Sequence, residues 1–582
     1  MRALYVVLPL VLAAPAGASD RPSPRSGLQF NAVDVPRGEA QSTTHATSGA
    51  TWNGASFPLK MTPLGHTADP IEGGLWGQTF DIHGAPVHAD DGRLVICNST
   101  DGVSIIPRGD ALFTVVHGEC QPGTLTLAEL AVDDGGGLSV SRARGLDLSS
   151  VGGGNLFCAA ESTTWGSHLA AEEYEADIRM LAADGTVSDD REAYNRMAWY
   201  HRDAFPRVSP YDYGWIAEVQ LLDDAGRTHI TKRTAMGRFS HEQARVMPDG
   251  RTVYLSDDGP NGGFFMFVAD VAGDLSVGTL YAARWDASQT GVGTLGWISL
   301  GRASEAQIAT WRAKGTGFDD LFESADPETC ADPFTSIHAM FGRECLRVRP
   351  GAELAASRLE TRRYAALRGA TTEFSKSEGT AIDPVGRRLY MAIARVERGM
   401  LAAHPKWDVG GPDHIRLERR PCGAILGADV VEGVADTDGH PIPSAWVVGP
   451  VSVVTEGMQE TIHGDSQFNA TRCDVDRIAG PDNVAFIPEA GVLLIAEDTS
   501  AKVNNALWAL DVASGELTRI LTVPRGGEVA GLQWYPDIRG RGYITFSVQE
   551  PFSKWGDVYW QDTTEGDPRS FWGVIGPFPP LK

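Results

Sequence analysis

Short apolar segments that follow acidic or glycine-containing turns recur along most of this chain, and this repetition constrains its fold. Four of them are residues 91–96, 249–255, 385–391 and 490–495. A second unit, two apolar runs joined by a tight turn, occupies residues 264–279 and 507–521 and is typical of a β-hairpin. Such repeats predict an all-β fold, a β-propeller of about six blades. The rival fold, a two-sheet sandwich, is usually far smaller than 582 residues.

One stretch departs from the strand pattern. Ser304 followed by Glu305 has the form of a helix N-terminus, and residues 352–367 are rich in Ala, Leu, Glu and Arg. We therefore predict a helical insertion at about residues 302–369, on one face or flank of a propeller domain that spans residues 61–582. Residues 19–60 are polar and are expected to form an N-terminal extension with little core.

The first 18 residues have the pattern of a secretory signal peptide. A basic start at Arg2 precedes an apolar run from Leu4 to Ala14, and small residues follow up to Ser19. The run is too short to span a membrane, and no later segment approaches ~20 apolar residues. We therefore expect a periplasmic or extracellular protein with no membrane span.

Acidic residues outnumber basic ones by 75 to 50, which gives a net charge of −25. Nucleic acid and anionic membranes repel such a surface, so neither is expected as a partner. The charge is compatible with cation binding and also with plain solubility. A monomer is expected.

The cysteines are seven, an odd number. Cys330 and Cys345 bracket a short segment and make a plausible disulfide, and Cys422 and Cys473 could form another. No CxxC pair occurs, which argues against a zinc ribbon. At least one thiol remains, and a buried, inert cysteine is its expected fate.

Four acidic clusters lie beside predicted strands, far apart in the sequence. They are residues 164–173, 238–242, 376–379 and 480–483, and Asp257 and Asp258 follow a further strand. The inner strands of a propeller converge on one axis, where these carboxylates would meet and raise one another's pKa unless a cation neutralised them. Oxygen-rich clusters suit calcium or magnesium, so the pattern predicts a metal site. Each cluster taken alone is also compatible with a solvated turn.

From about residue 75 to its end, the sequence resembles the PhoX-type alkaline phosphatases. The motifs that carry the resemblance are, in order, WGxxLxxEE at 165–173, GRFSHE at 237–242, SEG at 377–379 and PDN at 481–483. GRFSHE is the most specific of them. The resemblance implies a β-propeller with an axial cluster of iron and calcium ions, and the hydrolysis of small phosphate monoesters outside the cytoplasm.

The resemblance also implies roles for single residues. Metal ligands would be Glu172, Glu242, Glu378 and Asp482, with Glu173, Asp257, Asp258 and Asn483 as weaker candidates. Lys376 stands where the family tends to have a basic residue that contacts phosphate, and Arg395, at the end of an apolar strand, would help to clamp the phosphate. Arg395 has the alternative of a surface ion pair.

One position departs from the family. Ala171 stands where the motif has a cysteine that ligates iron, and Cys158, thirteen places earlier, is not expected to take its place. Without a thiolate the ligands are all oxygen, which favours calcium and leaves iron open. Two other functions also stay open, a calcium-dependent lactonase or organophosphate hydrolase and a non-catalytic calcium-binding propeller. Lys or Arg converging beside the carboxylates would favour phosphate, and apolar walls would favour a lactone.

Overall fold

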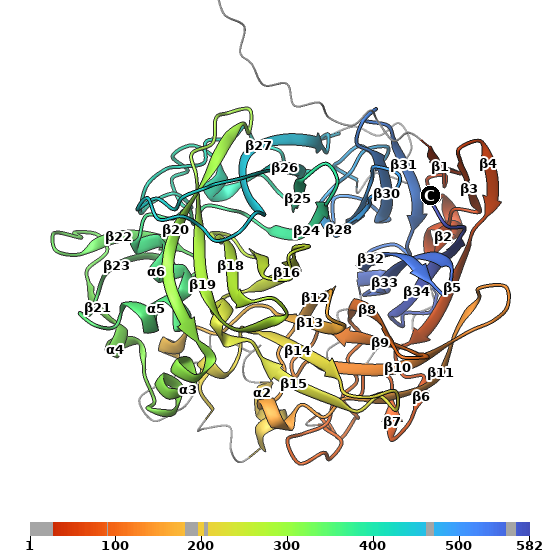
Figure 1. Ribbon diagram of the computed structural model, residues 1–582, viewed down its shortest axis with the longest axis horizontal. Helices are drawn as coiled ribbons and strands as arrows, with labels where there is room; N and C mark the ends of the chain where they lie inside the picture. The colour runs from red at the N-terminus through yellow and green to blue at the C-terminus, as the bar shows by residue number, and fades with distance from the viewer. Residues whose placement is uncertain are drawn as a thin grey trace, which may run out of the picture.

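The computed structural model describes residues 27–89, 91–180, 196–202, 208–460, 471–553 and 566–581. In these ranges the strands form blades arranged around a central axis (Figure 1). The predicted all-β propeller is therefore confirmed, with six blades among the described residues. The predicted signal peptide lies outside the described residues.

Each blade is an antiparallel sheet whose first strand lies nearest the axis. The first three blades are β8 (Thr100–Arg108), β9 (Ala111–Gly118), β10 (Thr124–Val132) and β11 (Leu138–Gly145); β12 (Phe157–Ser162), β13 (Ser167–Glu172), β14 (Ile216–Leu221) and β15 (Thr228–Lys232); and β16 (His241–Val246), β17 (Thr252–Asp257), β18 (Phe264–Val271) and β19 (Asp274–Trp285), extended by β20 (Gly293–Ser304).

The other three blades follow the same plan. They are β24 (Ser377–Asp383), β25 (Arg388–Ile393), β26 (Ala424–Val431) and β27 (Val447–Glu456); β28 (Pro481–Ile487), β29 (Val492–Glu497), β30 (Ala506–Asp511) and β31 (Leu517–Thr522), with β2 (His45–Ala46) at its edge; and β32 (Glu528–Ile538), β33 (Arg541–Gln549), β34 (Phe571–Phe578) and β5 (Lys60–His66). A short pairing of β20 with β27 joins the third and fourth blades into one sheet.

The ring of blades is closed. Each inner strand contacts the inner strand of the next blade, and β32 of the last blade contacts β8 of the first. Apolar side chains of neighbouring blades pack between them, as Leu169, Phe239 and Leu255 do between the second and third blades. Closure places the starts of all six inner strands around one axis.

The N-terminal segment belongs to the propeller rather than standing apart from it. Strand β5 pairs with β34 and so completes the last blade, and β2 pairs with β31. A small sheet of β1 (Leu28–Phe30), β3 (Gly49–Trp52) and β4 (Ala55–Pro58) precedes β5, and Leu28, Ala50 and Leu59 join the core of the last two blades. Residues 27–60 thus contribute more core than their polar composition indicates.

The same β-bulge recurs in every inner strand. In β8, Thr100 pairs with Gly118 and Val103 with Val116, so three steps on the inner strand oppose two on its partner. The inner strands of the other five blades show the same shift. A bulge breaks the regular alternation of side chains along a strand and so re-aims a side chain within it.

The predicted insertion contains helices and a small sheet. Its elements are α3 (Glu305–Ala313), α4 (Phe318–Leu321), β21 (Phe322–Ala325), β22 (Thr335–Ala339), β23 (Gly342–Val348), α5 (Glu353–Leu359) and α6 (Thr361–Leu367). Ser304 caps α3, since its side chain accepts the backbone N–H of Gln307. Apart from short 3-10 turns, the remaining elements are β6 (Pro70–Ile71), β7 (Gly74–Leu75) and α2 (Met197–His201).

Three disulfides cross-link the described chain. Cys330–Cys345 and Cys422–Cys473 are the two expected pairs, and Cys97–Cys120 is a third. Cys158 is the free, buried cysteine. Within the described ranges, no helix combines the length and the apolar character needed to cross a membrane.

The closing role of β5 is testable by deletion. Removing residues 27–66 should lower the thermal midpoint further and cause more aggregation than removing residues 27–58, because the first deletion exposes the edge of β34 and the second leaves β5 in place. Calorimetry and light scattering would measure both effects. Equal midpoints for the two deletions would show that β5 adds nothing.

Candidate metal centre

One side chain from each blade reaches the axis at the start of the inner strand. In five blades it is the second residue of the strand and the first of the two bulged residues, and in the sixth it opens the strand. The six are Asp101 of β8, Cys158 of β12, Glu242 of β16, Glu378 of β24, Asp482 of β28 and Glu528 of β32. Five carboxylates and one thiol therefore form an inner ring.

A second ring comes from the residue that directly follows the second strand of each blade. In five blades this residue is acidic: Glu119, Glu173, Asp258, Asp498 and Glu550. The fourth blade differs, because Ala394 follows β25 and Arg395 comes next. The acidic ring therefore has one interruption, and a cation stands beside it.

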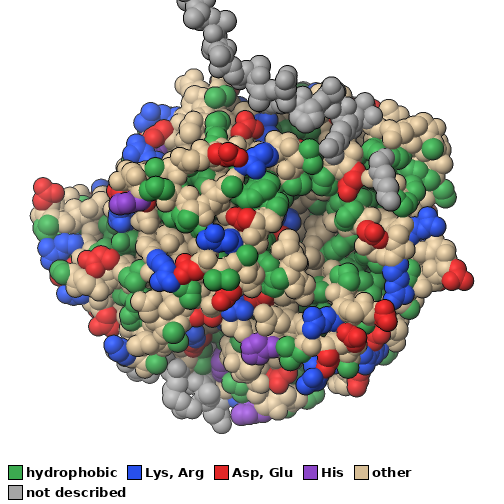
Figure 2. Space-filling view, in the orientation of Figure 1, with side chains coloured by type: hydrophobic (Ala, Val, Ile, Leu, Met, Phe, Trp, Pro, Cys, Tyr) green, Lys and Arg blue, Asp and Glu red, His purple; other side chains and the backbone are tan. Residues whose placement is uncertain are grey.

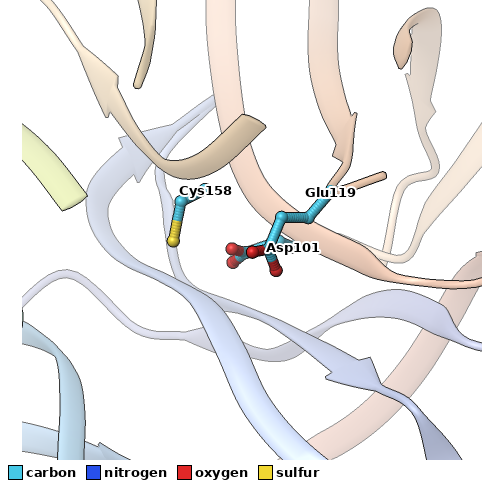
Figure 3. Close-up of side chains that lie close together, drawn as sticks. All are labelled: Asp101, Glu119 and Cys158. Carbon is cyan, nitrogen blue, oxygen red and sulfur yellow. The ribbon is translucent and has the colours of Figure 1, made fainter. Parts of the chain in front are cut away.

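The ligand atoms of nine of these side chains, all but Asp258 and Glu550, lie close together in overlapping groups. Within each group they are no more than 4.8 Å apart: Asp101, Glu119 and Cys158; Cys158, Glu173 and Glu242; Glu242, Glu378 and Asp482; and Asp482, Asp498 and Glu528. The Cys158 Sγ lies 3.0 Å from Glu242 Oε2. Figure 3 shows the Cys158 sulfur and the carboxylates of Asp101 and Glu119 facing one another from neighbouring blades.

The electrostatics of the ring are unfavourable without a cation. Burial and then the neighbouring carboxylates raise the pKa of Glu242, Glu378 and Glu173 well above the usual range. Burial, followed by the charge of Asp498, raises the pKa of Asp482 to about 7. Burial and then Asp101 and Glu242 also raise the pKa of the Cys158 thiol. A bound cation would reverse these shifts, since it favours the ionised ligands.

Unpartnered oxygen atoms point to the same conclusion. Asp101 Oδ1, Glu242 Oε1 and Asp258 Oδ1 are buried and make no hydrogen bond within the described structure. Leaving a buried carboxylate oxygen unsatisfied is costly, and multivalent cations with oxygen ligands are the usual solution. The donor set therefore fits a cluster of metal ions.

Lys376 is the cation nearest the acidic residues. Its Nζ lies 2.6 Å from Asp258 Oδ2 and 3.3 Å from Glu378 Oε1. Its backbone has a φ of 56°, in the left-handed region that costs a non-glycine residue free energy. Two hydrogen bonds hold this conformation, one from Lys376 N to Gly259 O and one from Ala394 N to Lys376 O.

Arg395 faces the ring from the interrupted position. It is half-buried. Burial raises the pKa of Asp498, and the charges of Lys376 and then Arg395 oppose this rise. The described part of the chain shows no ion pair or side-chain hydrogen bond for Arg395. Lys376 and Arg395 therefore supply positive charge on the fourth-blade side of the ring.

The structure brings together most of the residues expected from the sequence, but not all. Glu173, Glu242, Glu378 and Asp482 converge at the axis, and Asp258 joins them through Lys376, which pairs with both Asp258 and Glu378. The Asn483 side chain donates to Asp482 Oδ1 at 3.1 Å.

Two of the expected ligands lie elsewhere. Glu172 pairs with Lys232 at 2.8 Å and accepts the backbone N–H groups of Gly214 and Trp215. Asp257 accepts hydrogen bonds from the guanidinium of Arg362. Along the strands that carry them, successive side chains point to opposite faces, so adjacent carboxylates cannot both face the axis.

Cys158, which was not expected to take the place of the family's cysteine, lies among the acidic residues. Its Sγ lies within the ring, whereas Ala171 packs in the apolar cluster between the second and third blades. The thiol therefore comes from the inner strand of the second blade, and its neighbour β13 supplies Glu173. The alanine at position 171 therefore does not imply a site with oxygen ligands alone, because Cys158 can supply a sulfur ligand.

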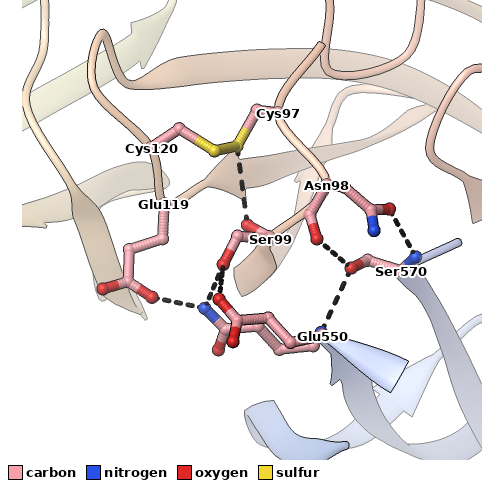
Figure 4. Close-up of a disulfide and its surroundings, with 8 residues drawn as sticks. Cys97, Asn98, Ser99, Glu119, Cys120, Glu550 and Ser570 are labelled. Carbon is pink, nitrogen blue, oxygen red and sulfur yellow. Dashed lines mark hydrogen bonds between the residues drawn. A yellow bond between two sulfur atoms is a disulfide. The ribbon is translucent and has the colours of Figure 1, made fainter. Parts of the chain in front are cut away.

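Five further acidic residues of the rings were not identified from the sequence, namely Asp101, Glu119, Asp498, Glu528 and Glu550. Their signal is positional, an acid at the start of an inner strand or just after the second strand. Figure 4 shows how Glu119 is held. It precedes the Cys97–Cys120 disulfide and accepts a hydrogen bond from Gln549, whose Nε2 also donates to Ser99 Oγ at 2.6 Å.

Comparison with known proteins gives one family. A family model described as "Alkaline phosphatase PhoX" matches residues 134–551, more than half of the chain. No curated protein sequence matches the chain.

Among solved structures, the chain is similar to Pseudomonas fluorescens PhoX in complex with vanadate, a transition state analogue. The TM-score is 0.59 at 18% identity, over 94% of this chain and 98% of that one. A putative 6-phosphogluconolactonase from Bacteroides uniformis matches over 80% of this chain and 96% of that one, at 12% identity and a TM-score of 0.29. The first likeness supports the fold, and the second is too weak to carry an argument.

The raised pKa values predict how the metal-free protein responds to pH. Asp482 and Glu119 have pKa values of about 7 in the folded chain, against ordinary values of 3.8 and 4.5. Between these values the folded state binds more protons than the unfolded state, so the free energy of unfolding falls as the pH rises towards 7. The thermal midpoint of chelated protein should be lower at pH 8 than at pH 5.

Added calcium should reduce this fall, because it neutralises the ionised ring. The double variant Asp482→Asn with Glu119→Gln should show a smaller fall than the native chain, which separates the ring from the general effect of net charge. Scanning calorimetry would measure both. Equal falls for the native chain and the variant would contradict the prediction.

Proposed function

Since the chain belongs to the PhoX alkaline phosphatase family, we propose that it is a metal-dependent phosphomonoesterase that releases phosphate from small phosphoesters outside the cytoplasm. Water would add to phosphorus as the ester P–O bond breaks, which gives phosphate and an alcohol. The three disulfides support a location outside the cytoplasm, because such bonds persist in oxidising compartments.

The observation that carries the proposal is the break in the acidic ring at the fourth blade. A phosphate monoester is an anion, and an unbroken ring of carboxylates would repel it. Lys376 lies beside Glu378 on the fourth blade, and Arg395 directly follows Ala394 at the interruption. The interruption therefore offers the substrate a positively charged approach to the metal ligands.

We propose that Glu242, Glu378, Asp482, Glu173 and Asp258 hold the ions together with Asp101, Glu119, Asp498, Glu528 and Cys158. The carboxylates suit calcium, and a deprotonated Cys158 provides a soft ligand that suits iron. Bound ions would supply positive charge against the phosphoryl oxygens in the transition state. Glu172 and Asp257 are left out of this set, because their oxygens are already paired with Lys232 and Arg362.

The chain's own cations bind and orient the substrate. A lysine ammonium has three donors, and Lys376 donates one of them to Asp258 while it forms an ion pair with Glu378, so a donor is left for a phosphoryl oxygen. Arg395 can donate two parallel hydrogen bonds to a phosphate. The two carboxylates beside Lys376 fix its ammonium in place. Less side-chain entropy is therefore lost when the substrate binds.

A propeller lactonase would need a neutral pocket with apolar walls. The two cations beside the carboxylates favour phosphate over a neutral ester. On the face drawn in Figure 2, acidic and basic side chains are interspersed, with no broad area of one charge. The positive charge that matters for an anionic substrate is therefore local to the ring.

Chelation and one substitution test this function. Purified protein should hydrolyse p-nitrophenyl phosphate at alkaline pH, and chelation should abolish the activity. Arg395→Met should raise KM and weaken inhibition by inorganic phosphate by about 10-fold or more, because a hydrogen bond between charged groups is lost. Arg387 lies at the other end of β25 and donates to Ala445 O, so Arg387→Met should leave both values unchanged.

Full activity after exhaustive chelation would rule out the metal-dependent mechanism. An Arg395→Met variant with native KM and native phosphate inhibition would remove Arg395 from the binding site.

The role of Cys158 has its own test. Elemental analysis of the native protein should find iron together with calcium. Cys158→Ser should lose the iron and its visible thiolate-to-iron absorption while it retains calcium, because the thiolate is the soft ligand in the ring. Native protein that contains calcium but no iron would contradict this assignment.

A further inference from the structure

A single buried arginine connects two of the segments that form the ring. Arg362, on α6 of the insertion, donates from Nε to Asp257 Oδ1 and Oδ2 at 2.9 and 2.8 Å. Its Nη1 and Nη2 donate to Glu175 Oε1 and Oε2 at 2.6 and 2.9 Å. The arginine and both carboxylates are at most 4% exposed. One guanidinium thus bridges the second and third blades.

Both carboxylates are close in sequence to residues of the metal centre. Asp257 directly precedes Asp258, and it pairs in the sheet with His241, the neighbour of Glu242. Glu175 follows Glu173 by two residues. Moving either carboxylate would therefore move a ligand that the ring needs.

Further contacts tie the same segments to α6 and its surroundings. Arg238 donates from its backbone N–H to Thr361 Oγ1 at 3.0 Å, and its Nη2 donates to Ala176 O at 2.6 Å. Tyr174, between Glu173 and Glu175, donates to Asp258 Oδ2 at 2.6 Å. The segment after β13 and the end of β17 are thus joined both through Arg362 and directly.

We propose that Arg362 is a positioning residue, which holds Glu173 and Asp258 at the spacing that a shared cation requires. These two acids repel each other when both are ionised, and repulsion alone would separate the segments that carry them. The arginine opposes that separation from outside the ring, through Asp257 and Glu175. This inference rests on the metal centre proposed above.

Arginine is suited to this role because its planar fork meets two carboxylates with four fixed hydrogen bonds. A lysine carries the same charge, but its compact ammonium cannot pair with both carboxylates in this geometry. Arg362→Lys therefore retains the charge and removes the bridge.

Arg363 provides a matched control. It is the next residue on α6, it is 1% exposed, and it pairs with Asp177, Glu344 and Glu360. None of these three carboxylates belongs to the ring or adjoins a member of it. Arg363→Lys should therefore reduce stability without a matching loss of metal affinity.

The experiment compares Arg362→Lys and Arg363→Lys as full-length chains. Calcium titration of the folded, chelated protein should give a dissociation constant raised about 10- to 100-fold by Arg362→Lys, the usual effect of losing a residue that orients metal ligands. Hydrogen exchange of the metal-free protein should increase at residues 173–177 and 257–259 in this variant. Arg363→Lys should bind calcium as the native chain does.

If Arg362→Lys does not fold, the neutral triple variant Arg362→Met, Asp257→Asn, Glu175→Gln replaces it, because it leaves no buried charge unpaired. The same loss of calcium affinity is expected. Native affinity in Arg362→Lys or in the triple variant, or an equal loss in Arg363→Lys, would overturn the inference. A native chain that binds no calcium would instead reject the metal centre itself.

Discussion

The structure depends on one constraint, the gathering of like charges at the axis of a closed ring. A regular strand in each blade would place successive side chains on alternate faces, in contact with the neighbouring blades. In five blades the bulge near the start of the inner strand changes this, because it inserts one residue and turns a side chain to the axis. In the sixth blade the bulge of β32 lies further along, and Glu528 reaches the axis as the first residue of its strand. Five copies of one local irregularity, together with the first residue of β32, therefore build the inner ring.

Close packing at the axis explains why small residues accompany the ligands. A Cβ added to Gly102, next to Asp101, would lie 2.7 Å from the carbonyl oxygen of Cys158, and one added to Gly379, next to Glu378, would lie 3.0 Å from Asp482 O. Neighbouring inner strands approach so closely there that larger residues would push them apart. The separation of the ligands, and so the size of ion they can share, depends on this approach.

The repeating strands and turns were enough to predict the propeller, because hydrophobic periodicity and tight turns are local properties. The site was only partly predictable. Motifs that match a known family, such as those at Glu242 and Glu378, were visible in the sequence, whereas Asp101 and Glu528 are single acids outside any such motif. Which of two adjacent acids faces the axis, as for Glu172 and Glu173, depends on strand register, and register is fixed by pairing between strands.

Cys158 shows a different limit of sequence reasoning. Aligning a motif assigns a function to a position along the chain, but a metal ion responds to position in space. The strand β12 lies beside β13, so a thiol on β12 can reach the carboxylate that follows β13. Cys158 and Ala171 are thirteen residues apart, which is about the length of a hairpin. A separation of this size is therefore compatible with both residues lying close together in space.

The insertion acts on the centre through its C-terminal end. Its helix α6 carries Arg362 to the acids of the second and third blades, and the chain then runs from Leu367 to Lys376 at the start of β24. A bridge between Gly262 and Phe374 and the hydrogen bond from Lys376 N to Gly259 O attach this connection to the third blade. The same helix thus precedes the cation of the ring and supports two of its acids. An element outside the propeller therefore sets the relative positions of charges that the blades alone would allow to move apart.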